Sequence, residues 1–199
     1  MRRDILEKWT DCVVTAGREP ASETLDDFER VLDDAADERP LQRLLAVSPT
    51  LLGPLVPPGG TYWCLDRPQL GAEYIPDFLL ASITSIGFRW VAIELESPNE
   101  KALTRAGVPA RKLAGALSQV RDWRTWLTEN TAYARSELGL KDIAGTCDAF
   151  VIIGRRNSLD PKQITKYRAL SADGVTVMSY DRLRDTIRNS THRGPIQNG

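Results

Sequence analysis

The sequence is poor in the residues that usually carry redox, zinc or histidine chemistry, with three cysteines and one histidine. Cys12, Cys64 and Cys147 lie far apart and form no CxxC pair, which argues against a disulfide framework and against a zinc site. His192 lies in the polar end of the chain, which argues against a histidine-based catalytic scheme. The stretch GVPARKLAG at 107–115 lacks the Lys-Ser/Thr ending of a Walker loop, so we expect no nucleotide cofactor.

Long apolar segments are also missing from the sequence. No run approaches the roughly 18 residues of a membrane span, and the start MRRDILEKW has no apolar segment of signal-peptide length. We therefore expect a cytoplasmic protein with no membrane partner. An excess of charge is missing too, because the formal net charge is −1, but 26 Lys and Arg residues leave room for a local basic face. Charge alone neither supports nor excludes DNA as a partner.

A chain of 199 residues is long enough for one packed domain. Two helices are predicted first, an acidic amphipathic one at 22–38 and a second at 38–47, which ends before a loop rich in Pro and Gly. The pattern then predicts three antiparallel strands, a long helix, a strand, a helix, a strand and a short helix, at 61–67, 76–84, 89–97, 108–138, 147–156, 161–172, 175–180 and 180–190. We divide the chain into a helical appendage at 1–36, an α/β domain at 37–190 and a flexible tail at 191–199.

Acidic residues stand inside two of the predicted strands. Residues two apart on a strand face the same side, so Glu94 and Glu96 should project together with Trp90 and Ala92. If the preceding strand pairs with this one in a hairpin, Asp77 can lie across from the same end. Three converging carboxylates repel one another unless a cation lies between them, and carboxylate oxygens are the ligands that Mg²⁺ prefers. The pattern therefore favours a metal site, although a single acid at a strand end is usually only solvated.

These residues resemble the motif of the PD-(D/E)xK nuclease family, in which an Asp of the second strand joins a (D/E)xK element of the third. Here the motif reads Pro76-Asp77 and Glu94-Leu95-Glu96, with Glu96 at the position where the family usually has Lys. Over residues 36–186 the chain is similar to the C-terminal nuclease domain of Shedu anti-phage defence proteins. That similarity rests on the order and spacing of ERPLQRLLAVSPTLL, PDFLLA, IELESPNEKALTRAG, ALSQVRDWRTWL, FVIIGRR and SYDRL.

The resemblance implies a restriction-endonuclease-like α/β fold: an αβββαβ core with a mixed central sheet flanked by helices, here with an N-terminal helical appendage. It also implies a DNA endonuclease dependent on Mg²⁺, for which Mn²⁺ can substitute. Asp77, Glu94 and Glu96 would be metal ligands and catalytic residues, with Glu96 as a variant of the motif. Glu38, on the first helix, would complete the metal site. Lys101 would supply the basic group that the motif lacks at 96.

Other basic and polar residues are assigned more weakly by the same comparison. Gln119, four residues before an aromatic residue on the long helix, would bind a metal-bound water or a phosphate, or would be only a polar residue at the edge of a packed helix. Lys112 lies on the same flank of that helix and would contact DNA. Arg155 and Arg156 follow a buried strand and would lie against the DNA backbone, or would be a solvated loop.

Two questions stay open at the level of sequence. The chain is either an active nuclease or a catalytically degenerate nuclease-like module that binds DNA ends or a partner protein and uses its acids for structure. Self-assembly into a homo-oligomer, a dimer or tetramer, is expected because duplex cleavage usually needs two sites. The acidic helix around 25–32 is either the interface of that assembly or packs on its own domain.

Overall fold

The runs of β-branched and aromatic residues form a six-stranded mixed sheet. The computed structural model describes residues 6–15, 20, 22–57 and 61–191. Its strands are hydrogen-bonded in chain order, and they are β1 (Val13–Val14), β2 (Tyr62–Asp66), β3 (Phe78–Thr84), β4 (Gly87–Leu95), β5 (Asp148–Ile152) and β6 (Val175–Met178). Strands β1 to β4 pair antiparallel, whereas β5 and β6 join the sheet parallel to β4. The predicted hairpin that brings the acids together is therefore present.

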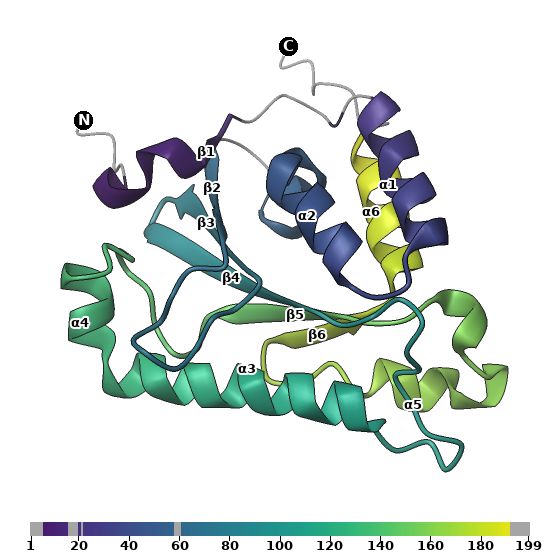
Figure 1. Ribbon diagram of the computed structural model, residues 1–199. Helices are drawn as coiled ribbons and strands as arrows, with labels where there is room; N and C mark the ends of the chain where they lie inside the picture. Colours follow the sequence, from purple (N-terminus) through teal and green to yellow (C-terminus); the bar gives the residue numbers. More distant parts are fainter. Residues whose placement is uncertain (1–5, 16–19, 21, 58–60, 192–199) are drawn as a thin grey trace.

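Helices cover both faces of this sheet (Figure 1). One face carries α1 (Ser22–Asp34), α2 (Arg39–Val47), η2 (Pro49–Leu55) and α6 (Tyr180–Thr191). The other carries α3 (Arg111–Glu129), which is followed by α4 (Thr131–Ser136). Shorter helical segments are η1 (Glu7–Cys12), η3 (Arg156–Ser158), η4 (Pro161–Gln163) and α5 (Ile164–Arg168). The mixed α/β fold predicted from the sequence is confirmed, with η1, β1 and α1 preceding the core. In the part of the chain that the structure describes, no helix is both long and apolar enough to cross a membrane.

Strand β4 divides its side chains between the two faces as a period of two requires. Trp90 and Ala92 belong to the apolar cluster beneath α3. Val91, Ile93 and Leu95 belong to the cluster beneath α1, α2 and α6. The next positions on the α3 side are Glu94 and Glu96, so the strand turns from apolar to acidic on one face at its C-terminal end.

Helix α1 packs on its own domain through its apolar face, while its part in any assembly stays a prediction. Phe28 and Leu32 are almost completely buried and share one apolar cluster with Leu45 of α2 and with Leu183 and Ile187 of α6. Although residues 1–36 are predicted as an appendage, their main helix is thus part of the layer that covers the sheet. The tail predicted at 191–199 lies outside the described residues, except for Thr191 at the end of α6.

Substituting Phe28 by Ala should lower the free energy of unfolding by about 3–5 kcal/mol, because the side chain is fully buried and leaves a cavity. Urea unfolding followed by circular dichroism would measure this loss. The matched control is Val47→Ala at a position that is 78% exposed, where we expect a change within about 0.5 kcal/mol. Equal stability of the two variants would show that α1 does not belong to the core.

Candidate functional site

The acids predicted from the sequence meet at one end of the β3–β4 hairpin. Phe78 of β3 pairs with Ile93 of β4, so the register continues to Asp77 opposite Glu94. The Leu95 amide donates a hydrogen bond of 2.8 Å to Oδ2 of Asp77, which links the acid to the neighbouring strand. Two carboxylates from adjacent strands therefore lie side by side on the α3 face of the sheet.

Glu94 is the most buried acid of this group, with 8% of the residue exposed. Among the described residues its carboxylate has neither a hydrogen-bond partner nor an ion-pair partner. Burial, with smaller contributions from Asp77 and Glu96, raises the pKa of Glu94 to about 8, and the charge of Arg67 only partly opposes this. Burial also raises the pKa of Asp77, against the hydrogen bond from Leu95. A buried carboxylate with a raised pKa, such as that of Glu94, is stabilised when it binds a cation or a proton.

Glu96 lies just beyond β4 and is paired with a lysine of α3. Nζ of Lys112 lies 3.4 Å from Oε2 of Glu96, and the Lys112 side chain is 45% exposed. Burial raises the pKa of Glu96, although Lys112 acts in the opposite direction. The basic residue that contacts the acid at the motif's usual lysine position is therefore Lys112, from the first turn of α3.

Glu38 also acts on this site, but it belongs to the helical layer that contains α2, on the face of the sheet opposite α3. It precedes α2, and its negative charge raises the pKa values of both Asp77 and Glu96. Asn99, in the loop after β4, donates hydrogen bonds of 2.9 and 3.0 Å to the carbonyls of Ala35 and Ala36. These bonds tie the segment that carries Glu38 to the loop that follows Glu96.

Tyr180, at the start of α6, holds the backbone at the third acid. Its hydroxyl donates a hydrogen bond of 2.9 Å to the carbonyl of Glu96, and its side chain is completely buried. Burial, followed by the charges of Asp77, Glu38 and Glu96, raises the pKa of Tyr180 well above its usual range. Gly154 closes the same corner with a left-handed φ of 69°, and a Cβ there would lie 2.4 Å from the carbonyl oxygen of Glu100. Glycine is therefore required where the loops after β4 and β5 meet.

Arg67 is a further residue of the site that the sequence did not reveal. It directly follows β2, and its amide donates a hydrogen bond of 2.9 Å to the carbonyl of Asp77. Its positive charge lowers the pKa values of both Asp77 and Glu94 against the effect of burial. The sequence could have indicated Arg67 only by its position at the end of β2, the strand that pairs with β3 after Pro76-Asp77.

Not all predicted site residues are brought together. Lys101 is exposed and makes no hydrogen bond or ion pair with the residues that the structure describes. Gln119 is also exposed, and it lies seven residues after Lys112 on α3, roughly 10 Å farther along the helix axis. The site therefore contains the four predicted acids, and neither of these two residues contacts them.

Arg155 and Arg156 are engaged in ion pairs with the helices beside them. Arg155 contacts Asp181 at 3.2 Å and Asp33 at 3.0 Å, and Arg156 is paired with Asp185. The Arg155 pairs join the loop after β5 to α6 and α1, which is a structural role. Contact of these arginines with DNA stays a prediction, and it would have to compete with the ion pairs.

The donor types at the site fit a hard divalent cation, but their arrangement is not a complete coordination set. The buried Glu94 carboxylate lacks a described partner, and three further carboxylates act on it or on its neighbours electrostatically. Oxygen donors of this kind suit Mg²⁺ and Mn²⁺. Over the described ranges, however, no three His, Cys, Asp or Glu side chains are grouped closely enough to hold a metal ion as they stand. The carboxylate side chains of the site would have to rotate to coordinate one ion together.

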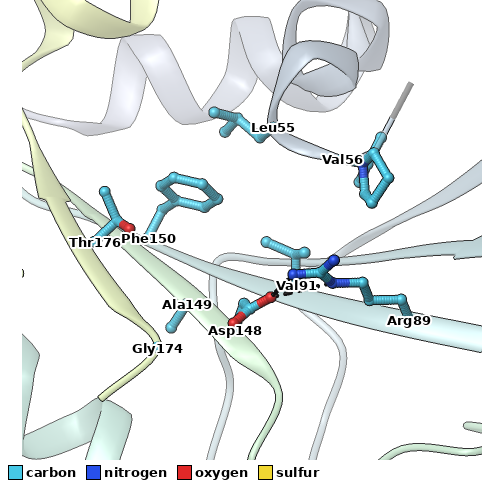
Figure 2. A pocket seen from close by; sticks show the side chains of 10 residues that line it. Leu55, Val56, Arg89, Val91, Asp148, Ala149, Phe150, Gly174 and Thr176 are labelled. Atoms are coloured by element: carbon cyan, nitrogen blue, oxygen red, sulfur yellow. Dashed lines mark hydrogen bonds and ion pairs between the residues drawn. The ribbon is translucent and has the colours of Figure 1, made fainter. Parts of the chain in front are cut away.

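A separate cavity of about 360 Å³ lies on the opposite face of the sheet, toward the other end of β4 (Figure 2). Leu55 and Val56 lie above it, Phe150 lines its wall, and Arg89 and Asp148 stand at its edge. These two charges form an ion pair of 2.6 Å, so they neutralise each other. The cavity contains none of the acids of the site.

Comparison with known proteins identifies the family of this chain. The family model described as Shedu protein SduA, C-terminal, matches residues 35–183, which includes all four acids, Arg67 and Lys112. No curated protein matches the chain significantly. Because the matched segment covers well over half of the sequence, the chain belongs to the Shedu SduA C-terminal family, and this membership suggests a role in anti-phage defence.

Proposed function

We propose that this protein is a DNA endonuclease that hydrolyses phosphodiester bonds with Mg²⁺, or with Mn²⁺ in its place. One observation carries the proposal: Glu94 is nine-tenths buried at the end of paired strands, has no partner among the described residues, and is acted on by the charges of Asp77 and Glu96. A buried anion without a counter-charge is costly, and a bound cation would remove that cost. Membership of the Shedu SduA C-terminal family suggests a role in anti-phage defence, and DNA is the target that we propose for that role.

In this proposal Asp77, Glu94, Glu96 and Glu38 hold the cation. A divalent ion bound there supplies Lewis acidity toward a phosphoryl oxygen and makes a neighbouring water more acidic. The protein's own contribution is to fix the carboxylates. Leu95 holds one oxygen of Asp77 through its amide, and Tyr180 holds the backbone of Glu96. The second oxygen of Asp77 and the whole Glu94 carboxylate stay available.

Two lysines compete for the role of the basic residue. Lys112 is favoured because it already contacts Glu96 at 3.4 Å while 45% of its side chain is exposed. From there it can donate to a phosphate or to the attacking water. Lys101 is nearer in sequence and would have to reach back from its exposed position.

The second candidate is a nuclease-like module that binds DNA ends or a partner protein without cutting. It is favoured by one observation, the lack of a ready group of three metal-binding side chains in the described parts of the chain. In that case the Lys112–Glu96 ion pair is structural, and the acids only shape the edge of the sheet.

Plasmid cleavage in Mg²⁺ by the wild type and three variants separates these alternatives. For an active site we expect Glu96→Gln to lose cleavage by orders of magnitude with folding intact, because the change removes a ligand or base but keeps the shape. Lys112→Ala should lose at least tenfold, and Lys101→Ala should lose less.

A wild type that cuts while Glu96→Gln and Lys112→Ala remain fully active would contradict the assignment of the site. A wild type that is inactive with every divalent ion would support the degenerate module. In that event Glu96→Lys, which restores the usual pattern of the nuclease family, is the variant expected to gain activity.

We also propose that the protein acts as a homo-oligomer, because cleavage of both strands of a duplex usually needs two active sites. The apolar residues Phe28 and Leu32 of α1 are buried within the chain, so they are not available to the interface of that oligomer. Light scattering on the full chain would report a mass of two or four chains. A monomeric mass, with and without duplex DNA, would contradict the proposal.

A further inference from the structure

Arg67 is not one of the residues proposed to hold the cation, yet it lies in the same row as Asp77 and Glu94. The row runs across three strands: Asp66 pairs with Phe78 and Phe78 with Ile93, so Arg67, Asp77 and Glu94 occupy the next level. The amide of Arg67 donates to the carbonyl of Asp77 at 2.9 Å. Its place beside the acids is thus fixed by the backbone rather than by a flexible loop.

The backbone of Arg67 is held in an unfavourable conformation. Its φ is +46°, in the left-handed region that residues with a Cβ seldom adopt. Pro68 follows it and disfavours the ordinary helical conformation at this position. Strained non-glycine residues are concentrated at functional sites, where the surrounding structure compensates the cost. A glycine or asparagine would fit this turn more easily, so the arginine side chain itself needs an explanation.

The side chain of Arg67 does not serve as a structural ion-pair partner. The residue is exposed, and its guanidinium forms no hydrogen bond or ion pair with any residue that the structure describes. By contrast, Arg155 and Arg156 are both bound to aspartates. A guanidinium beside buried carboxylates, with its donors still free, suits a second anion approaching from solvent.

We propose that Arg67 is the phosphate-binding residue of this site and contacts the DNA backbone at the bond that the acids act on. This inference rests on the proposed function. The planar guanidinium can donate two parallel hydrogen bonds to one phosphate, which a lysine cannot. The acids repel a phosphate, and Arg67 supplies an opposing charge at the same level of the sheet.

The experiment measures binding of a fluorescent 20-base-pair duplex to the full chain by anisotropy, in EDTA and at several salt concentrations. We expect Arg67→Ala to weaken binding roughly tenfold and to reduce the salt slope by about one, because one phosphate contact is lost. Arg67→Gly should weaken binding equally, and it controls for misfolding because glycine accepts the positive φ. Arg67→Lys should keep the salt slope, and in Mg²⁺ its cleavage rate should fall because the paired hydrogen bonds are lost. Arg30→Ala, in an exposed α1 position paired with Asp27, is the matched control and should bind as the wild type does.

Unchanged affinity and salt slope in both Arg67→Ala and Arg67→Gly would overturn the assignment. A wild type that does not bind the duplex would overturn it as well, because no phosphate would then be present for Arg67. A wild type that binds but never cuts would refute the proposed nuclease activity alone, and a loss of affinity in the two variants would still support Arg67 as the phosphate-binding residue.

Discussion

Replacing Glu94 by Gln is expected to reduce DNA cleavage by roughly two or more orders of magnitude. The side chain is the most buried of the site's carboxylates, and the charges of both Asp77 and Glu96 act on it. Glutamine has almost the same shape but carries no charge, and it binds a divalent cation much more weakly. Initial rates of plasmid nicking in Mg²⁺ would measure the loss.

The matched control for this substitution is Glu129→Gln at the far, exposed end of α3. It makes the same chemical change outside the site and should cut at the wild-type rate. Thermal unfolding of both variants shows whether they are folded. Wild-type activity in Glu94→Gln would remove Glu94 from the site and with it the central acid of the proposal.

The second large effect is on stability in the absence of divalent ions. The pKa of Glu94 is raised to about 8 in the folded chain, from 4.5 when unfolded. The unfolded chain therefore loses this proton at a lower pH than the folded chain does. The contribution of Glu94 to the free energy of unfolding is fully present below about pH 4.5 and declines as the pH rises toward 8. The loss is on the order of a few kcal/mol, since one pKa unit corresponds to about 1.4 kcal/mol.

The other titratable groups do not reverse this decline in stability with rising pH. Asp77 and Glu96 also have raised pKa values and add to the decline, and Arg67 opposes it. Burial opposes the lowering of the pKa values of Asp181 and Asp185, but hydrogen bonds and charges of neighbouring arginines outweigh it. These two acids act in the opposite sense, but only at acidic pH below about 4. The thiols of Cys12, Cys64 and Cys147 also have pKa values raised by burial, so they add to the decline only above about pH 8. The range from pH 5 to 8 therefore reports on the acids of the site.

Thermal unfolding in EDTA across that range, followed by circular dichroism, would test the expectation. The wild type should become less stable with rising pH, and Glu94→Gln should show a much flatter dependence. Curves of the two proteins that run parallel over pH 5–8 would show that Glu94 is not the group responsible. The comparison needs no enzymatic activity and no bound metal.

The part of the site that could be predicted from the sequence is the part governed by local periodicity. The alternation along β4 placed Glu94 and Glu96 on one face, and the short hairpin put Asp77 opposite that end. Both rules act over a few residues, because strand side chains alternate strictly and a tight turn fixes the register. The order of strands and helices follows from the same short-range signals.

The part that escaped prediction depends on packing between distant segments. The Lys112–Glu96 contact requires the angle at which α3 crosses the sheet, and the Tyr180 hydrogen bond spans 84 positions in the sequence. Arg155 and Arg156 have aspartate partners on α1 and α6 that no local pattern connects to them. Glu38 was placed through family resemblance, because nothing in its own helix indicates the acids across the layer.

Binding of a divalent cation by the four acids is the central claim, and electron paramagnetic resonance of Mn²⁺ titrated into the protein tests it most directly, because the signal of free Mn²⁺ falls when the ion is bound. We predict saturable binding of about one Mn²⁺ per chain, displaced by excess Mg²⁺ and lost in Glu94→Gln but kept in Glu129→Gln. Mn²⁺ that stays free with the wild type, or that binds equally well to Glu94→Gln, would contradict the account.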